Sequence, residues 1–225
     1  GDLVTFPSAQ ADAPGIGVDY FHVDGIFDRK THTNRKEAEF IVDLIFRNIQ
    51  KYPDRSLGVV AFSVAQQDLI DKLLSKRRQQ LPQWEPFFRQ DAAEPFFIKN
   101  LETVQGDERD TILFSVAYGK DAQGRLLHNF GPLNRTGGER RLNVAVTRAK
   151  CNVQLVSSMH DTDIDLMRTS SDGARLLREY LDYAEHGAAA LERSMRVRPY
   201  EQFDLDFELE VCEFLRSKGF SVDTQ

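Results

Sequence analysis

The sequence has few cysteines, no long apolar run and no excess of positive charge. Cys151 and Cys212 are its two cysteines, and their separation fits neither a metal pair nor a disulfide framework, so a reducing cytoplasm is the expected location. The longest apolar runs, such as residues 112–118, fall far short of the roughly 20 residues that a membrane helix needs. A formal charge of −6 argues against a uniformly basic nucleic-acid binder but leaves room for a local basic face.

Two further absences concern nucleotides and metals. No G-x-x-x-x-G-K-[ST] phosphate loop occurs, and no acidic pair of the magnesium-binding kind follows an apolar strand. We therefore expect no metal site in the chain, and we expect the half of a nucleotide site that grips ATP to lie elsewhere. The chain opens at Gly1 without a methionine and stops at Gln225 just after a new element begins, so we expect a piece of a larger protein.

Strands and helices are predicted to alternate through residues 18–184. Their apolar positions recur at the spacing of strands or of amphipathic helices. The expected strands are 18–23, 57–62, 96–99, 111–118 and 151–157, and the expected helices are 33–50, 66–78, a short one after residue 137, and 171–183. This order is typical of βαβ units and predicts an α/β domain with a mainly parallel sheet.

The segment Gly137–Lys150, GGERRLNVAVTRAK, is the most distinctive stretch of the sequence. A helix is predicted to begin after the glycines, with one buried stripe formed by Leu142, Ala145, Val146 and Ala149. At 100° per residue, Arg141 and Arg148 would lie within about 20° of each other on one flank. A guanidinium there could grip phosphate oxygens bidentately. The alternative is an ordinary surface helix with solvated arginines.

A second candidate segment is NLETVQGDERD, which begins at residue 100 about forty residues earlier. Gly106 permits a tight turn that brings backbone close to a ligand. Glu108 and Asp110 would then present carboxylates at the mouth of the following strand. Because ligands of open α/β sheets bind at the carboxyl ends of strands, we expect the turn to lie at that edge. The alternative is a plain glycine-containing surface turn.

Two other polar positions begin expected helices. Asn34 can cap the first helix, with Glu37 completing a near capping box, and Arg35 lies in the exposed first turn, where backbone N–H groups attract anions. Ser63 follows the strand 57–62 and can offer a hydroxyl contact. The alternatives are a capped helix with a surface arginine and a plain turn serine.

Three aromatic residues follow the second expected helix. Trp84, Phe87 and Phe88 lie beside Arg89 and could stack on bases. A small cluster of core residues under a loop is the more common arrangement, and we favour it.

Four segments together resemble superfamily 1B helicases, the group that includes the nonsense-mediated-decay helicase. RRLNVAVTRAK resembles motif VI, QGDE stands at the place of motif V, GVVAFSVAQQ at that of motif IV, and TNRKEA is similar to the NRxEA segment that opens the second motor domain. The resemblance implies a three-layer RecA-like domain of the P-loop NTPase type over residues 1–185. The chain has Ala61 where many relatives have threonine, so a hydroxyl contact would pass to Ser63.

The resemblance also implies roles for single residues. Arg148 would be the arginine finger that touches the γ-phosphate of ATP, which the first RecA-like domain holds together with Mg²⁺. The other residues implied to face ATP are Arg35, Gln105, Gly106, Glu108 and Arg141. Thr103 and Ser63 would contact a single strand of DNA or RNA.

The last part of the chain resembles a different family. Residues 186–202 read as a locally basic linker, and residues 203–225 resemble the opening of a restriction-endonuclease-like domain of the very-short-patch-repair type. Glu208 would match the acidic residue on that family's first helix. The other acids and the lysine of such a nuclease are missing, so this piece cannot cut DNA by itself. The segment NFGPLN, which precedes the arginine segment, looks like the corresponding segment of large bacterial helicases that carry such a nuclease-like tail.

The expected function is that of the second motor domain of an ATP-dependent helicase or translocase. Two alternatives from other classes stay open. One is a nucleic-acid-binding or nuclease-accessory module of a bacterial defence or repair system, and the other is a non-catalytic RecA-like scaffold. The chain alone is expected to hydrolyse no ATP, because it lacks a phosphate loop.

Overall fold

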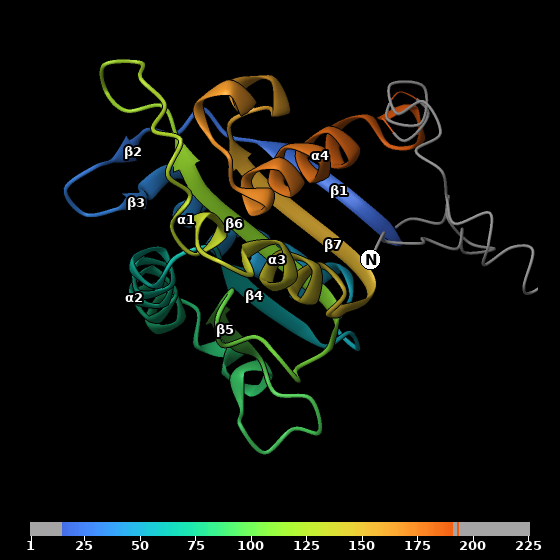
Figure 1. Cartoon of the computed structure of the whole chain (residues 1–225). Helices are drawn as coiled ribbons and strands as arrows, with labels where there is room; N and C mark the ends of the chain where they lie inside the picture. Colours follow the sequence, from blue (N-terminus) through green and yellow to red (C-terminus); the bar gives the residue numbers. More distant parts are fainter. Residues whose placement is uncertain (1–14, 191–192, 194–225) are drawn as a thin grey trace, which may run out of the picture. The chain divides into compact units, whose positions relative to one another are not determined.

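A computed structural model of the chain describes residues 15–190 and 193 (Figure 1). The chain divides after Gly187 into two units, and the fold described below is that of the first. Most of the predicted linker, and all of the nuclease-like segment 203–225, lie outside the described residues. Among the described helices, none is both long and apolar enough to cross a membrane.

A five-stranded sheet forms the middle layer of the domain. Its spatial order is β1 (Gly17–His22), β7 (Ala149–Ser158), β6 (Arg109–Gly119), β4 (Leu57–Ala61) and β5 (Phe97–Asn100). Every neighbouring pair in this sheet is parallel. The mainly parallel sheet predicted from the alternation of strands and helices is therefore confirmed.

Helices cover both faces of the sheet, as Figure 1 shows. One face carries α1 (Arg35–Lys51) and α2 (Val64–Gln80), and the other carries α3 (Gly138–Val146) and α4 (Asp172–His186). Short 3₁₀ helices lie in the connections: η1 (Pro82–Phe88), η2 (Gly131–Asn134), η3 (Asp161–Asp163) and η4 (Leu166–Arg168). The result is the three-layer α/β architecture of the RecA-like kind that the sequence predicts.

The predicted apolar stripes lie in two hydrophobic clusters, one on each face of the sheet. The stripe of α1, formed by Ala38, Ile41, Val42, Ile45 and Ile49, is buried against β6 and β7. Leu142 and Ala145 of α3 pack with Ala174 and Leu177 of α4 on the other face. Each fully buried valine, leucine or isoleucine side chain contributes about 1.5–3 kcal/mol, so these stripes hold the helices on the sheet.

The helix α3 is shorter than predicted. It ends at Val146, and the backbone N–H of Arg148 bonds to the carbonyl of Ala145 at 3.0 Å in a tightened last turn. Ala149, which was expected in the helical stripe, is the first residue of β7. Arg148 therefore lies past the helix, and the predicted flank shared with Arg141 does not form.

The start of α1 differs from the predicted capping box. Asn34 caps the helix by accepting a bond from the backbone N–H of Glu37, as predicted. The Glu37 carboxylate, however, is fully buried and accepts bonds from the Ala117 N–H at 2.7 Å and the Ser115 hydroxyl at 3.0 Å, both in β6. The Asn34 N–H bonds instead to Oε1 of Gln66 at 2.8 Å. Glu37 thus ties α1 to the sheet.

A small hairpin precedes α1 and was not predicted. It consists of β2 (Phe27–Asp28) paired with β3 (Thr33–Asn34). The Asp28 carboxylate accepts bonds from the N–H groups of Lys30 at 2.8 Å and Thr31 at 3.4 Å, which shapes the tip. Figure 1 shows the hairpin projecting beside the loop that follows β6, and the Phe27 N–H donates to the Lys120 carbonyl at 3.0 Å.

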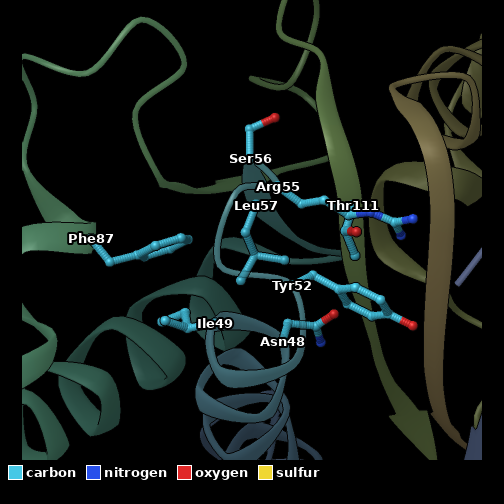
Figure 2. Close-up of a pocket in the computed structure, with 8 residues that line it drawn as sticks. All are labelled: Asn48, Ile49, Tyr52, Arg55, Ser56, Leu57, Phe87 and Thr111. Carbon is cyan, nitrogen blue, oxygen red and sulfur yellow. The ribbon is translucent and has the colours of Figure 1, made fainter.

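The aromatic residues after α2 pack into the hydrophobic cluster on the α1 face of the sheet, which agrees with the packing role favoured from the sequence. The Phe88 ring is buried and meets the Phe46 and Phe96 rings with centroids 6.1 and 5.1 Å apart. Figure 2 shows Phe87 facing Ile49 and Leu57 in a hollow at the end of α1. This hollow has no room for a water molecule, so Phe87 serves packing there.

Candidate nucleotide-facing edge

The two strongest sequence segments meet at the amino edge of the sheet. Glu108 immediately precedes β6 and Arg148 immediately precedes β7, and these strands are neighbours in parallel register. The Arg109 N–H donates to the Arg148 carbonyl at 3.1 Å, which holds the two strand starts together.

The side chains of Glu108 and Arg148 are in contact. Nη1 of Arg148 lies 3.2 Å from Oε1 of Glu108, while its Nε and Nη2 donate to the Val144 carbonyl at 2.9 Å and the Thr147 hydroxyl at 3.0 Å. The Arg148 side chain is 21% exposed and that of Glu108 is 53% exposed. The guanidinium is thus held in place, and its ion pair is open to solvent and correspondingly weak.

A buried arginine fixes the turn that carries Glu108. Nη1 of Arg109 donates to the Glu108 carbonyl at 2.6 Å, and its Nε and Nη2 donate to the Pro95 carbonyl at 3.0 and 2.6 Å. Its guanidinium carbon also lies 4.7 Å from the centre of the Phe97 ring. The sequence analysis missed this residue, because an arginine at the start of a strand is normally exposed.

The Gln105–Gly106 turn leads directly to this edge. Both residues are exposed, and Gly106 has φ = 89°, which L side chains rarely adopt. A Cβ at Gly106 would meet nothing within 4 Å, so the turn leaves open space beside its backbone. Asp110 is not free to join it, because its carboxylate accepts bonds from the Ser56 N–H at 2.9 Å and the Ser56 hydroxyl at 3.0 Å.

The edge itself differs from the one expected. The turn was expected at the carboxyl ends of the strands, but it precedes β6 and so lies at the amino end. The rule that places ligands at carboxyl ends describes loops that follow strands, and this loop connects the end of β5 to the start of β6.

Arg35 lies at the opposite edge of the sheet. The neighbouring Glu37 contacts Ser115, which is seven positions beyond Glu108 along β6, or roughly 20 Å at the rise of a strand. The Arg35 side chain is 71% exposed and pairs with Glu39 at 2.8 Å. The structure therefore does not bring Arg35 to the Glu108–Arg148 pair.

Arg141 also stays apart from that pair. Its Nη1 donates to the carbonyls of Thr136 at 3.0 Å and Pro132 at 3.5 Å, on the N-terminal side of α3. Arg148 lies beyond the other end of the same helix.

The predicted nucleic-acid residues lie together at the carboxyl edge. Ser63 follows β4 and Thr103 follows β5, the neighbouring strand. The Ser63 hydroxyl accepts from the Gln66 N–H at 3.2 Å and caps α2, which is the plain structural role weighed as its alternative. Oγ1 of Thr103 accepts from the Asn100 N–H at 3.1 Å. Both hydroxyl oxygens thus accept hydrogen bonds from nearby backbone N–H groups. Ser63 and Thr103 both lie at the carboxyl edge of the sheet.

An open polar pocket of about 530 Å³ lies between the N-terminal ends of α3 and α4. Arg135, Arg168, Glu139 and Asp172 contribute equal numbers of positive and negative charges to its lining. Neither Glu108 nor Arg148 lines this pocket or the hollow of Figure 2.

The amino edge fits a phosphate group better than either pocket does. The guanidinium of Arg148 is held by a carbonyl and a hydroxyl, and its carboxylate partner Glu108 is exposed and easily exchanged for another anion. The open Gln105–Gly106 turn lies two residues from that carboxylate.

The solved structures that resemble this chain include one of low sequence similarity. The C-terminal domain of a possible DNA helicase from Lactobacillus plantarum WCFS1 aligns with a TM-score of 0.36 and 16% identity, over 54% of this chain and 66% of that one. This similarity is too low to carry an argument.

Comparison with curated proteins gives two relatives. The chain is 40% identical over 190 residues to the uncharacterized ATP-dependent helicase MG140 of Mycoplasma genitalium, covering 82% of this chain and 16% of that protein. It is 33% identical over 216 residues to the MG140 homolog of Mycoplasma pneumoniae, covering 92% of this chain and 19% of that protein. The chain thus spans less than a fifth of the length of either relative. Residues 17–160, more than half of the chain, match the family described as the AAA domain, and the chain therefore belongs to the AAA domain family.

Proposed function

We propose that this chain is the second motor domain of an ATP-dependent nucleic-acid helicase or translocase. The names of the two Mycoplasma relatives support an ATP-driven activity, and the three-layer fold with its parallel sheet suits a motor domain. The absence of a phosphate loop from the sequence means that another domain supplies the ATP-gripping half of the site.

The observation that carries this proposal is the contact between Arg148 and Glu108 at the amino edge. In the proposed motor, Arg148 is the arginine finger that reaches the γ-phosphate of an ATP held with Mg²⁺ on a first RecA-like domain. Glu108 orients the guanidinium and lies near the ribose, and the Gln105–Gly106 turn faces the same nucleotide. An arginine finger stabilises the charge of the phosphoryl-transfer transition state and contributes about 10³–10⁵ in rate.

The opposite edge supplies the nucleic-acid contacts in this proposal. Thr103 and Ser63 would contact the backbone of a single strand of DNA or RNA, because tracking along a strand needs backbone contacts and no sequence reading. Closing on ATP and opening after hydrolysis would move the strand bound at the carboxyl edge. Residues 203–225 would begin a restriction-endonuclease-like domain.

Arg148→Ala in the longer protein tests the assignment. We expect strand-stimulated ATP turnover to fall by about 10³ or more with the fold unchanged by circular dichroism. The matched control is Arg140→Ala, which removes an arginine 88% exposed on the adjacent helix and should leave turnover within about twofold. Unchanged turnover in the Arg148 variant would contradict the proposal.

The same assay separates the motor from the non-motor alternatives. If the longer wild-type protein binds single strands but hydrolyses no ATP, the chain is a binding module or a scaffold. The 225-residue chain alone serves as a blank and should show no hydrolysis.

A further inference from the structure

Three side chains of metal-ligating types meet between η3 and the last turn of α4. They are Asp161, Asp182 and His186, and each offers a ligand atom within 4.8 Å of those that the other two offer. The group lies beyond the carboxyl end of β7, whereas Arg148 precedes the amino end of this ten-residue strand. At the rise of a strand, about 30 Å separate the two places. The proposed role of Arg148 therefore uses none of the three side chains.

Two of the three side chains come from one helix. Asp182 and His186 are four positions apart in α4, so they project from the same side of it. Nδ1 of His186 lies 2.9 Å from Oδ1 of Asp182 and 3.2 Å from the Asp182 carbonyl oxygen. An ion bound to both side chains would lie about 2.1 Å from each ligand atom, which places the nitrogen and the oxygen roughly 3.0–3.4 Å apart. A small movement thus converts the hydrogen bond into joint coordination.

Asp161 reaches this pair from a different element. It begins η3, which packs against α4, and its side chain is half-buried. Within the described residues, its carboxylate has no recorded hydrogen bond or ion pair. Two carboxylates as close as those of Asp161 and Asp182 repel each other. A protonated His186 relieves part of this repulsion at low pH, and a divalent cation supplies twice that charge.

A separate set of contacts fixes η3 against α4. Nδ1 of His160, which precedes η3, lies 3.0 and 2.9 Å from the two carboxylate oxygens of Glu185 in α4. The His160 ring also stacks on His22 of β1 with centroids 4.2 Å apart. The Asp163 carboxylate accepts a bond from the His160 N–H at 3.0 Å and pairs with Lys120 at 2.7 Å. Because these contacts use none of the three ligands, they bring the ligands together before an ion arrives, which lowers the entropic cost of binding.

The two segments that carry the ligands are acidic. Residues 160–163 and 179–186 contain no lysine or arginine and five acidic residues, which are Asp161, Asp163, Glu179, Asp182 and Glu185. Two basic side chains border them: Lys120 pairs with Asp163, and Arg178 lies one turn before Asp182 in α4. With both of these counted and the histidines neutral, the acids still outnumber the bases by three. This charge favours a cation over an anion.

We propose that Asp161, Asp182 and His186 bind a divalent transition-metal ion of the Zn²⁺ kind. Two carboxylate oxygens and one imidazole nitrogen suit such an ion, and three protein ligands leave a position for water. Mg²⁺ and Ca²⁺ prefer oxygen ligands alone, so the histidine disfavours them. The sequence analysis expected no metal site, because Asp161 lies 21 positions before Asp182 and only the fold brings the two together. The inference is independent of the proposed function.

Isothermal titration of the 225-residue chain with Zn²⁺ tests the site. We expect the wild type to bind the ion, and Asp161→Asn and His186→Gln each to weaken binding by at least about tenfold, since even the loss of an outer-shell partner costs 10–100-fold. Matched controls are Asp172→Asn, at the other end of α4, and His32→Gln, at the β2–β3 hairpin, both at exposed positions. The two controls should bind Zn²⁺ as the wild type does, and Mg²⁺ should bind the wild type more weakly than Zn²⁺.

Paramagnetic Co²⁺ locates the ion in the wild-type chain without any substitution. In amide NMR spectra, the signals of Asp161, Asp182 and His186 should broaden at the lowest Co²⁺ concentrations. A wild-type chain that binds no Zn²⁺, wild-type affinity in both ligand variants, equal losses in the ligand and control variants, or broadening centred elsewhere in the chain would each overturn the inference. The Arg148 assay uses none of these residues, so a failed metal test leaves the proposed function standing.

Discussion

At the scale of single residues, Glu37 shows how a charge can be used inside this fold. Its carboxylate is fully buried and faces only hydrogen-bond donors among its recorded partners: the Ala117 N–H, the Ser115 hydroxyl and the Asn34 amide. Burial raises the pKa of the group to about 7, while the hydrogen bonds from Ala117, Ser158 and Ser115 act in the opposite direction. The sequence could not show this, because a glutamate at the third helical position usually faces the helix end.

Truncating this residue should destabilise the domain. Glu37→Ala would leave several buried donors without partners and create a cavity, so we expect the free energy of unfolding to fall by about 3 kcal/mol. Glu39→Ala, two positions away and exposed, should change it by less than about 0.5 kcal/mol. Urea unfolding of both variants measures the difference in their unfolding free energies. Equal stabilities would show that the contacts of Glu37 with β6 do not stabilise the domain.

Glu37 also predicts a pH dependence. Its pKa rises from 4.5 to about 7 on folding, so the folded state binds the proton more tightly. The stabilisation is complete below pH 4.5 and is lost as the pH rises through 7, by about 3 kcal/mol in total. Between about pH 5 and pH 8, wild-type stability should therefore fall relative to that of Glu37→Ala. Burial lowers the pKa of His22, which makes stability rise with pH. Because His22 is present in both proteins, its contribution cancels when their stabilities are compared. A difference in unfolding free energy between the two proteins that stays constant from pH 5 to pH 8 would contradict the raised pKa of Glu37.

At the scale of elements, two glycines allow α3 and α4 to begin against the same carbonyl. A Cβ on Gly138 or Gly173 would lie 2.1 or 2.2 Å from the oxygen of Leu133. The Ser171 hydroxyl, which caps α4, donates to that oxygen at 2.7 Å. The position of α3, and with it the turn that ends at Arg148, depends on this close approach.

Alanine at either glycine should loosen that junction. We expect Gly138→Ala and Gly173→Ala each to cost about 3 kcal/mol of unfolding free energy, since the clash is with backbone and cannot be relieved by a side-chain rotation. Gly124→Ala is the control, because its Cβ would meet nothing and only its φ of 73° opposes alanine, at a cost of about 1 kcal/mol. Chemical denaturation of the three variants would refute this view if all three lost the same stability.

The sequence predicted helices and strands correctly where an apolar pattern repeats over several turns, and it failed at the ends of these elements. The stripe of α1 spans three turns and fixes its buried face, whereas α3 is so short that Ala149 fitted the helical spacing although it begins β7. The β2–β3 hairpin was missed because its strands have two residues each, too few for any alternation.

At the scale of the whole molecule, the two edges of the sheet divide the candidate residues. Motif spacing correctly paired the segments of Glu108 and Arg148, because parallel neighbouring strands start at the same edge. Arg35 could have been placed from connectivity alone. A helix that leads into a strand of a parallel sheet starts near the carboxyl edge, and α1 leads into β4. The residues next to an arginine in the sequence do not show at which edge of the sheet it lies.

The central claim is that Arg148, at the amino edge of the sheet, completes a nucleotide site whose other half lies on another domain. The most direct test is the ATP turnover of the longer protein at saturating single strand, with Arg148→Ala and Arg140→Ala measured side by side. We predict that Arg148→Ala lowers turnover by about 10³ or more, while Arg140→Ala, which removes an exposed arginine of α3, stays within about twofold. Equal turnover in the two variants would contradict the claim.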